Sequence, residues 1–232
     1  MSSGNRLNLN KLLIPTDSKE GKPLEDFSAI SGNVEVVFRN LEDRLIAEIQ
    51  KSKFVVGCVA WLTSYRVLDA LAQTKVSLIV QKEDFLRPDH YSKATLHAKY
   101  EKLTSGSLER YSFPGIGGSL NTCGDTEIGA IHCVGNFNSD KSPAHPRMHN
   151  KFVVFCDVID KDPEHPKIAP ISVWTGSFNF SHNANDSFEN AVIINDPKIA
   201  GAYLNEFEQI YALGEKLNWE SEWSAPIRRI GS

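Results

Sequence analysis

One stretch of the sequence places a histidine and a lysine at a spacing that suits chemistry on an anion. His149 and Lys151 open a run that continues through apolar residues to Cys156 and Asp157. Because side chains two residues apart on a strand share a face, the imidazole and the ammonium point the same way. A lysine holds a phosphoryl group as a point charge, and a histidine can attack phosphorus or move a proton. The pair therefore predicts an anion site.

A second polar group follows a later apolar run. The tetrapeptide GSFN (176–179) comes directly after the run ISVWT, at the end of a predicted strand, where α/β sheets present ligand groups. Ser177 and Asn179 offer a hydroxyl and an amide on one face. Glu189 opens the next predicted strand and can accept the second ring N–H of His149, which would fix the tautomer of that ring. We therefore expect one site built from three separate segments.

The elements that must position these residues alternate between strand and helix. Asn40, Ser64 and Asp196 stand where side chains commonly cap helices, and Pro197 suits a first helical turn. This alternation predicts one α/β layered domain. The apolar patterns predict strands at 33–38, 54–61, 76–80, 127–134, 149–158, 171–175 and 189–195, and helices at 40–51, from 64, at 89–103 and at 197–213.

The composition is that of an ordinary soluble protein. The chain has 232 residues, 41% of them hydrophobic and 23% charged, and a formal net charge of −4. No apolar run approaches the roughly 20 residues that cross a bilayer, and the polar N-terminal segment lacks the apolar core of a signal peptide. We expect a cytoplasmic protein with no membrane association. The expected organisation is an irregular N-terminal arm (1–30), one catalytic domain (31–213) and a C-terminal tail (214–232).

The histidine, lysine and GSFN motifs, followed by the pair Glu189-Asn190, resemble the signature of the phospholipase D superfamily. That signature is HxK, four residues and Asp (the HKD motif), then GSxN or GSxxN, then a later Glu-Asn. The resemblance covers about residues 33–213 and is strongest to the small single-motif members, the bacterial Nuc-type endonucleases and their mitochondrial and Zucchini-like relatives. It implies a phospholipase D-like fold, with a mixed β-sheet flanked by helices on both faces.

The sequence departs from the signature at one position. Cys156 stands where the family has Asp, and the acid follows at Asp157. A one-residue bulge in the strand would re-aim Asp157 into its family position, and otherwise the supporting role is lost. The resemblance assigns supporting roles to Asp157 and Asn190.

The resemblance implies a two-step cleavage of a phosphodiester that needs no metal and no other cofactor. One histidine attacks phosphorus and forms a phosphohistidine, and a second histidine protonates the leaving oxygen. Lysine and asparagine side chains neutralise the phosphate oxygens. The chain holds one convincing motif, so a homodimer must supply the second, with the active site at the dimer interface. His149, Lys151, Ser177, Asn179 and Glu189 are the expected catalytic residues.

Other residues either flank this site or are not expected to belong to it. Arg147 lies two residues before His149, Phe178 can stack on a base, and His182 follows the GSFN segment, so these three are expected to bind substrate. A second HxK, at 97–99, lies in a predicted helix and lacks a following GSxN, so it is not expected to act. Pro146 separates His145 from His149 and argues against a helical metal site.

The leading functional hypothesis is hydrolysis of nucleic acid, single-stranded DNA or RNA. A lipid phosphodiesterase and a catalytically idle binding or assembly module of the same fold are the alternatives. Residues of the tail, namely Trp219, Trp223, Arg228 and Arg229, are the weak support for a lipid surface. A nuclease module that works with a partner protein in a defence or processing system is a further possibility.

Overall fold

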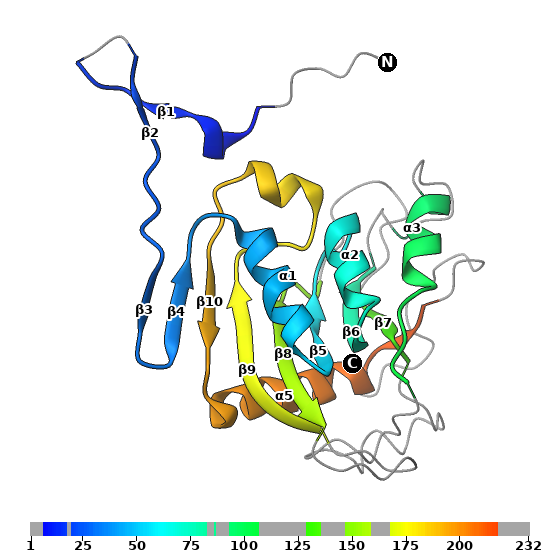
Figure 1. Cartoon of the computed structure of the whole chain (residues 1–232). Helices are drawn as coiled ribbons and strands as arrows, with labels where there is room; N and C mark the ends of the chain where they lie inside the picture. Colours follow the sequence, from blue (N-terminus) through cyan, green and yellow to red (C-terminus); the bar gives the residue numbers. More distant parts are fainter. Residues whose placement is uncertain are drawn as a thin grey trace.

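The computed structural model describes residues 7–17, 20–82, 86, 93–106, 129–135, 147–158 and 168–217. Figure 1 shows the arrangement of its elements. The strands are β1 (Leu13–Ile14), β2 (Lys22–Pro23), β3 (Ala29–Ser31), β4 (Val34–Val37), β5 (Phe54–Val59), β6 (Lys75–Gln81), β7 (Ile131–Val134), β8 (Lys151–Val158), β9 (Ile168–Gly176), β10 (Ala191–Ile194) and β11 (Glu215–Lys216). The α-helices are α1 (Leu41–Lys51), α2 (Tyr65–Leu71), α3 (Lys93–Tyr100) and α5 (Pro197–Ala212), and the 3-10 helices include η1 (Leu9–Lys11) and η4 (His182–Asp186).

A large mixed sheet organises the molecule. Within the described residues its nine strands run in the order β11-β7-β6-β5-β8-β9-β10-β4-β3. Strand β5 pairs in parallel with β6, and β6 in parallel with β7, whereas the other neighbours pair antiparallel. Strand β8, which follows His149, therefore lies in the middle of the sheet and is hydrogen-bonded to a neighbouring strand on each side.

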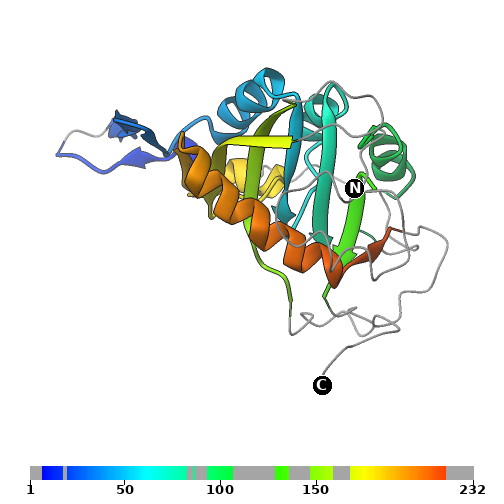
Figure 2. The ribbon, with the colours of Figure 1, turned by 90° about the horizontal axis from the view of Figure 1, so that it is seen from below.

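Helices cover both faces of this sheet, as the view in Figure 2 shows. Alternate side chains of β8 point to opposite faces. Val153 and Phe155 belong to the core beneath α1 and α2, and Phe152 and Val154 belong to the core beneath α5. A strand buried on both faces reads as a continuous apolar run, which explains the sequence pattern. The predicted layered α/β fold is confirmed.

The helix starts agree with the predicted caps at two positions of three. Ser64 Oγ accepts from the Val67 N–H, and Asp196 Oδ1 accepts from the Lys198 and Ile199 N–H groups. Asn40 differs, because its φ of 55° is left-handed and its side chain makes no cap bond. Asparagine tolerates this conformation well, so Asn40 turns the chain into α1 without capping it.

The arm from residue 7 to residue 31 contains short elements. Strands β1 and β2 form a separate hairpin, and β3 joins the edge of the large sheet. The side chain of Asn8 donates to Asp186 Oδ1 at 2.8 Å, and that of Asn10 donates to the Ser187 carbonyl at 2.9 Å. These bonds tie the arm to the segment between β9 and β10.

Several predicted features lie outside the described residues. They are most of the Gly- and Ser-rich loop at 104–125, the start of the strand at 127, His145, most of the insertion at 160–170 and most of the tail beyond 214. The limits of the three predicted segments of the chain stay predictions. No helix in the described part of the chain is long and apolar enough to cross a membrane.

Candidate active site

The three motif segments meet at the same end of three neighbouring strands. Strand β9 is antiparallel to both β8 and β10, so the start of β8, the end of β9 and the start of β10 lie together. Phe152 stands opposite Thr175, and Gly176 stands opposite Ala191. The sheet topology thus brings together segments that are separated by up to 40 positions in the sequence.

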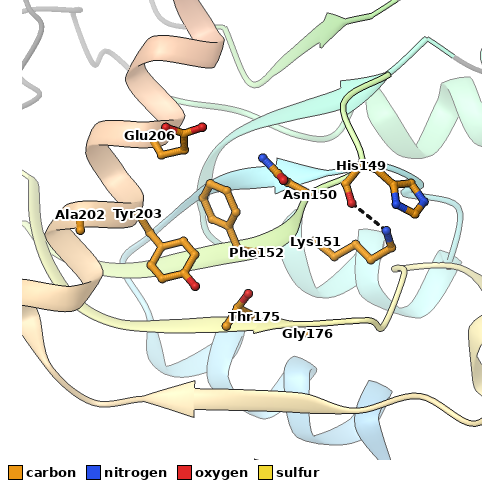
Figure 3. Close-up of a pocket in the computed structure, with 9 residues that line it drawn as sticks. All are labelled: His149, Asn150, Lys151, Phe152, Thr175, Gly176, Ala202, Tyr203 and Glu206. Carbon is orange, nitrogen blue, oxygen red and sulfur yellow. Dashed lines mark hydrogen bonds between the residues drawn. The ribbon is translucent and has the colours of Figure 1, made fainter. Parts of the chain in front are cut away.

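His149 lies two residues before β8, and cations surround it. Lys151 Nζ donates to the His149 carbonyl oxygen at 2.8 Å, as Figure 3 shows. Partial burial lowers the pKa of His149, and the positive charges of Lys151 and Arg147 lower it further. All three effects favour the neutral imidazole, the form whose ring nitrogen carries a lone pair able to attack.

Lys151 is nearly buried, with 9% of its surface exposed. Burial is the largest effect on its pKa and lowers it, and the nearby carboxylate of Glu189 acts in the opposite direction. The ammonium is thus bonded to the His149 carbonyl and interacts electrostatically with the acid of the other motif.

Ser177, Glu189 and Asn190 form a closed hydrogen-bonded unit. Ser177 Oγ donates to Glu189 Oε2 and accepts from the Asn190 N–H at 3.1 Å. The Ser177 N–H donates in turn to the Asn190 carbonyl at 3.1 Å. The bond that the sequence suggested between Glu189 and His149 is not among the hydrogen bonds of the described residues, where Glu189 pairs with Ser177.

Gly176 permits this close pairing. A Cβ atom at position 176 would lie 2.8 Å from Ala191 Cα and would also clash with the Asn190 carbonyl oxygen. Backbone atoms cannot move aside as a flexible side chain can. A glycine is therefore required where β9 delivers Ser177 to the site.

Asn179 and Phe178 occupy different environments in the GSFN segment. The Asn179 Oδ1 atom is buried and finds no hydrogen-bond partner in the described part of the chain. Phe178 was expected to bind substrate, but it is 1% exposed and packs with its ring 6.5 Å from that of Trp174. No ring face is left for a base, so the prediction for Phe178 is corrected to a core role.

The two remaining predicted substrate residues differ in position. Arg147 acts on the pKa values of both His149 and Lys151, which places its charge beside them. His182 is exposed at the start of η4, and its ring meets that of Tyr65 edge-on at 5.2 Å between centroids.

Asp157 lies at the far end of β8. The strand keeps an unbroken register against β5 from Lys151 to Cys156, so no bulge in β8 re-aims the acid. Six residues at about 3.3 Å each separate Asp157 from Lys151 by about 20 Å. Without that bulge, the supporting role predicted for Asp157 is corrected: the acid pairs there with Lys53 at 2.6 Å.

The comparisons with known proteins agree with this geometry. Residues 126–211 match the family model described as cardiolipin synthase, PLD-like domain, and that segment holds every expected catalytic residue. Over 235 residues the chain is 32% identical to the uncharacterized protein L381 of Acanthamoeba polyphaga mimivirus, covering 93% of this chain and 75% of the viral protein. The chain belongs to the phospholipase D superfamily.

Two solved structures are similar to this phospholipase D superfamily chain. Nuc from Salmonella typhimurium, a phospholipase D family member, has a TM-score of 0.49 and 18% identity, covering 78% of this chain and 95% of Nuc. NucT from Helicobacter pylori has a TM-score of 0.49 and 13% identity, covering 78% of this chain and 96% of NucT.

In this superfamily member an open groove of about 490 Å³ adjoins His149. Sequence reasoning missed several residues of its walls, because they come from α5 and from strand positions outside the motifs. Tyr203 and Glu206 are three residues apart and share one face of α5, a spacing that was visible in the sequence. The lining residues are His149, Asn150, Lys151, Phe152, Thr175, Gly176, Ala202, Tyr203 and Glu206.

The backbone around His149 is held from both sides. The Met148 N–H donates to Gln81 Oε1 at 2.7 Å, and the Ala60 N–H donates to the Asn150 carbonyl at 2.9 Å. Gln81 is fully buried at the end of β6 and was not predicted to serve the site. A polar residue that ends an apolar strand was its only sequence signal.

Proposed function

We propose that this chain is a metal-independent phosphodiesterase that cleaves nucleic acid through a phosphohistidine at His149. The observation that carries the proposal is the charge around that ring. Partial burial, Lys151 and Arg147 favour the neutral, nucleophilic imidazole, and the two cations supply positive charge for a phosphodiester. The same two cations thus serve the nucleophile and the substrate.

The proposed reaction has two displacements at phosphorus. A ring nitrogen of His149 attacks, the N–P bond forms, and the P–O bond to the leaving group breaks. The His149 of a second copy gives its proton to the leaving oxygen. Water then attacks phosphorus and breaks the N–P bond, while the second histidine takes the proton of that water.

The residues around His149 have distinct parts in this reaction. Lys151 and Arg147 offset the charge of the non-bridging oxygens, which grows in the transition state. The Asn179 amide supplies further hydrogen bonds to these oxygens. Glu189 accepts from Ser177 and its charge attracts Lys151, so it keeps both donors in place.

A second copy is needed because one imidazole cannot be nucleophile and acid at once. The other described histidines lie elsewhere: His97 is 3.4 Å from Glu101, His132 is buried against Tyr211, and His182 packs on Tyr65. Two copies related by a twofold axis would each present His149 to the other. Nucleic acid is the proposed substrate because the motif pattern resembles the single-motif endonucleases.

The test is cleavage of labelled single-stranded oligonucleotides in EDTA. The wild type is expected to cut, and His149→Ala to lose activity by about a thousandfold or more. His97→Ala is the matched control, since it removes the histidine of the other HxK and is expected to change nothing. Loss of wild-type cleavage on chelation, or full activity of His149→Ala, would sink the proposal.

A lipid phosphodiesterase is the second candidate. The match to a model described as a cardiolipin synthase domain favours it. Release of headgroups from phospholipid vesicles, without cleavage of oligonucleotides, would select it. An idle module would show neither activity and would trap no phosphohistidine.

A further inference from the structure

The groove beside His149 has a gradient of charge along its length. Lys151 stands at the His149 end, and Glu206 on α5 stands at the other end, with its carboxylate directed into the groove (Figure 3). A phosphate bound at His149 would meet attraction, whereas a further phosphate near Glu206 would meet repulsion. The far end therefore suits an uncharged part of a nucleotide.

Resting on the nuclease function proposed above, we propose that this far end holds a guanine base next to the scissile phosphate. The carboxylate of Glu206 would accept the N1–H and N2–H groups of the base. Tyr203, also from α5, and Thr175, from β9, line the same space with hydroxyl groups. These hydroxyls can donate to the guanine O6 atom.

Guanine is favoured because it alone presents two neighbouring N–H donors along its pairing edge. Adenine and cytosine offer an amino group beside a ring nitrogen lone pair, and that lone pair would face the carboxylate. Thymine and uracil offer one N–H between two carbonyl oxygens. Such repulsive contacts contribute to specificity as much as attractive ones do. Glu206 already accepts from Gln209 Nε2 at 3.2 Å, and a carboxylate has further lone pairs for the base.

Packing holds one wall of the groove in place. Tyr203 is half-buried, and its ring meets Phe152 edge-on at 5.0 Å between centroids. Phe152 is itself 3% exposed, so it holds the Tyr203 ring in place. A volume of about 490 Å³ falls within the usual range for ligand pockets. A base reaches it most easily from a single strand, where no pairing must be broken.

The test uses single-stranded oligonucleotides in EDTA that differ in one central nucleotide, with cleavage positions mapped on sequencing gels. The wild type is expected to cut next to guanine. Glu206→Gln keeps the size of the side chain and is expected to reduce the preference for guanine by about tenfold or more. Tyr203→Phe is expected to reduce it less, because one hydroxyl is lost while the ring stays on Phe152.

Glu101→Gln is the matched control, since it removes the same charge from an exposed position just after α3. It is expected to leave the preference unchanged. Wild-type cleavage without guanine preference, or an unchanged preference in Glu206→Gln, would overturn the inference and leave the nuclease proposal standing. Failure of the wild type to cut any oligonucleotide, with or without headgroup release from vesicles, would overturn both.

Discussion

Around His149, partial burial and two neighbouring cations all favour the neutral form of the imidazole. The ring is exposed to the groove, yet partial burial and two cations all act against its protonation. In a two-step displacement the nucleophile must be neutral before it attacks, so its pKa sets the acid limb of the pH–rate profile. In the proposed reaction the cations would therefore extend activity toward lower pH.

The substitution Arg147→Gln tests this effect. It removes a positive charge that lowers the pKa of His149, so that pKa is expected to rise and the acid limb of kcat/KM to move to higher pH. NMR titration of the His149 ring protons measures the same change directly. Lys53→Gln, which removes a cation at the opposite end of β8, serves as the control and is expected to leave the limb in place. If the acid limb of Arg147→Gln moved to lower pH instead, Arg147 would not be lowering the pKa of His149.

The sequence was sufficient to place some site residues and not others. His149, Ser177 and Glu189 were predictable because each lies next to one end of an apolar strand. The ends of neighbouring strands lie together in a sheet. Phe178 was not, because the turn after Gly176 directs its ring into the core, a direction that depends on tertiary packing. Glu206 is contributed by a distant helix, and its spacing from Tyr203 shows a shared helix face but not that this face meets the site.

At the scale of elements, β8 connects two chemically separate regions. Its first residue, Lys151, belongs to the site, and Asp157, six positions on, belongs to an exposed ion pair with Lys53. The hydrogen bond from Lys53 lowers the pKa of Asp157. That interaction is exposed to water, so its contribution to folding is small.

Asp157→Asn is therefore expected to leave cleavage unchanged, although the family signature has an acid at the neighbouring position. Steady-state kcat/KM on an oligonucleotide is the measurement, with thermal unfolding as a check on the fold. Lys151→Met is the comparison from the opposite end of the same strand and is expected to abolish cleavage. A tenfold loss in Asp157→Asn would show that the acid acts on the site through the strand.

The order of the predicted strands and helices was readable because each buried strand is an apolar run. Shifts in the register between paired strands could not be predicted from the apolar pattern. The register between β8 and β9 shifts so that Ile171 is an extra residue on β9, next to Pro170. Proline lacks the N–H that a regular ladder needs, which explains why the irregularity lies there. The irregularity thus lies on β9, whereas moving Asp157 into its family position would need a bulge in β8.

For the whole molecule, the proposed chemistry makes one chain half of an active site. The formal net charge of −4 describes the entire surface and says little about a cleft where Lys151 and Arg147 gather. A twofold dimer would double that local positive charge. If the active site forms only in the dimer, activity should depend on the fraction of the protein that is dimeric.

Mixing wild type with His149→Ala tests the shared site. If each site needs His149 from both copies, activity at fixed total protein should fall as the square of the wild-type fraction, to about a quarter in an equal mixture after subunit exchange. Independent copies would give a linear fall, to about a half. An affinity tag on the His149→Ala chain alone, with recovery of untagged wild type on the affinity resin, confirms that exchange has produced mixed dimers.

The hydrogen bonds between Ser177 and Asn190 allow the sequence between these residues to change without moving the site residues. They close the segment from 177 to 190 at its base, so the spacing of Ser177 and Glu189 does not depend on the residues between them. Insertions and substitutions within η4 can accumulate there while the closure keeps the two site residues together. The segment is a place where new recognition properties can evolve without a loss of catalytic geometry.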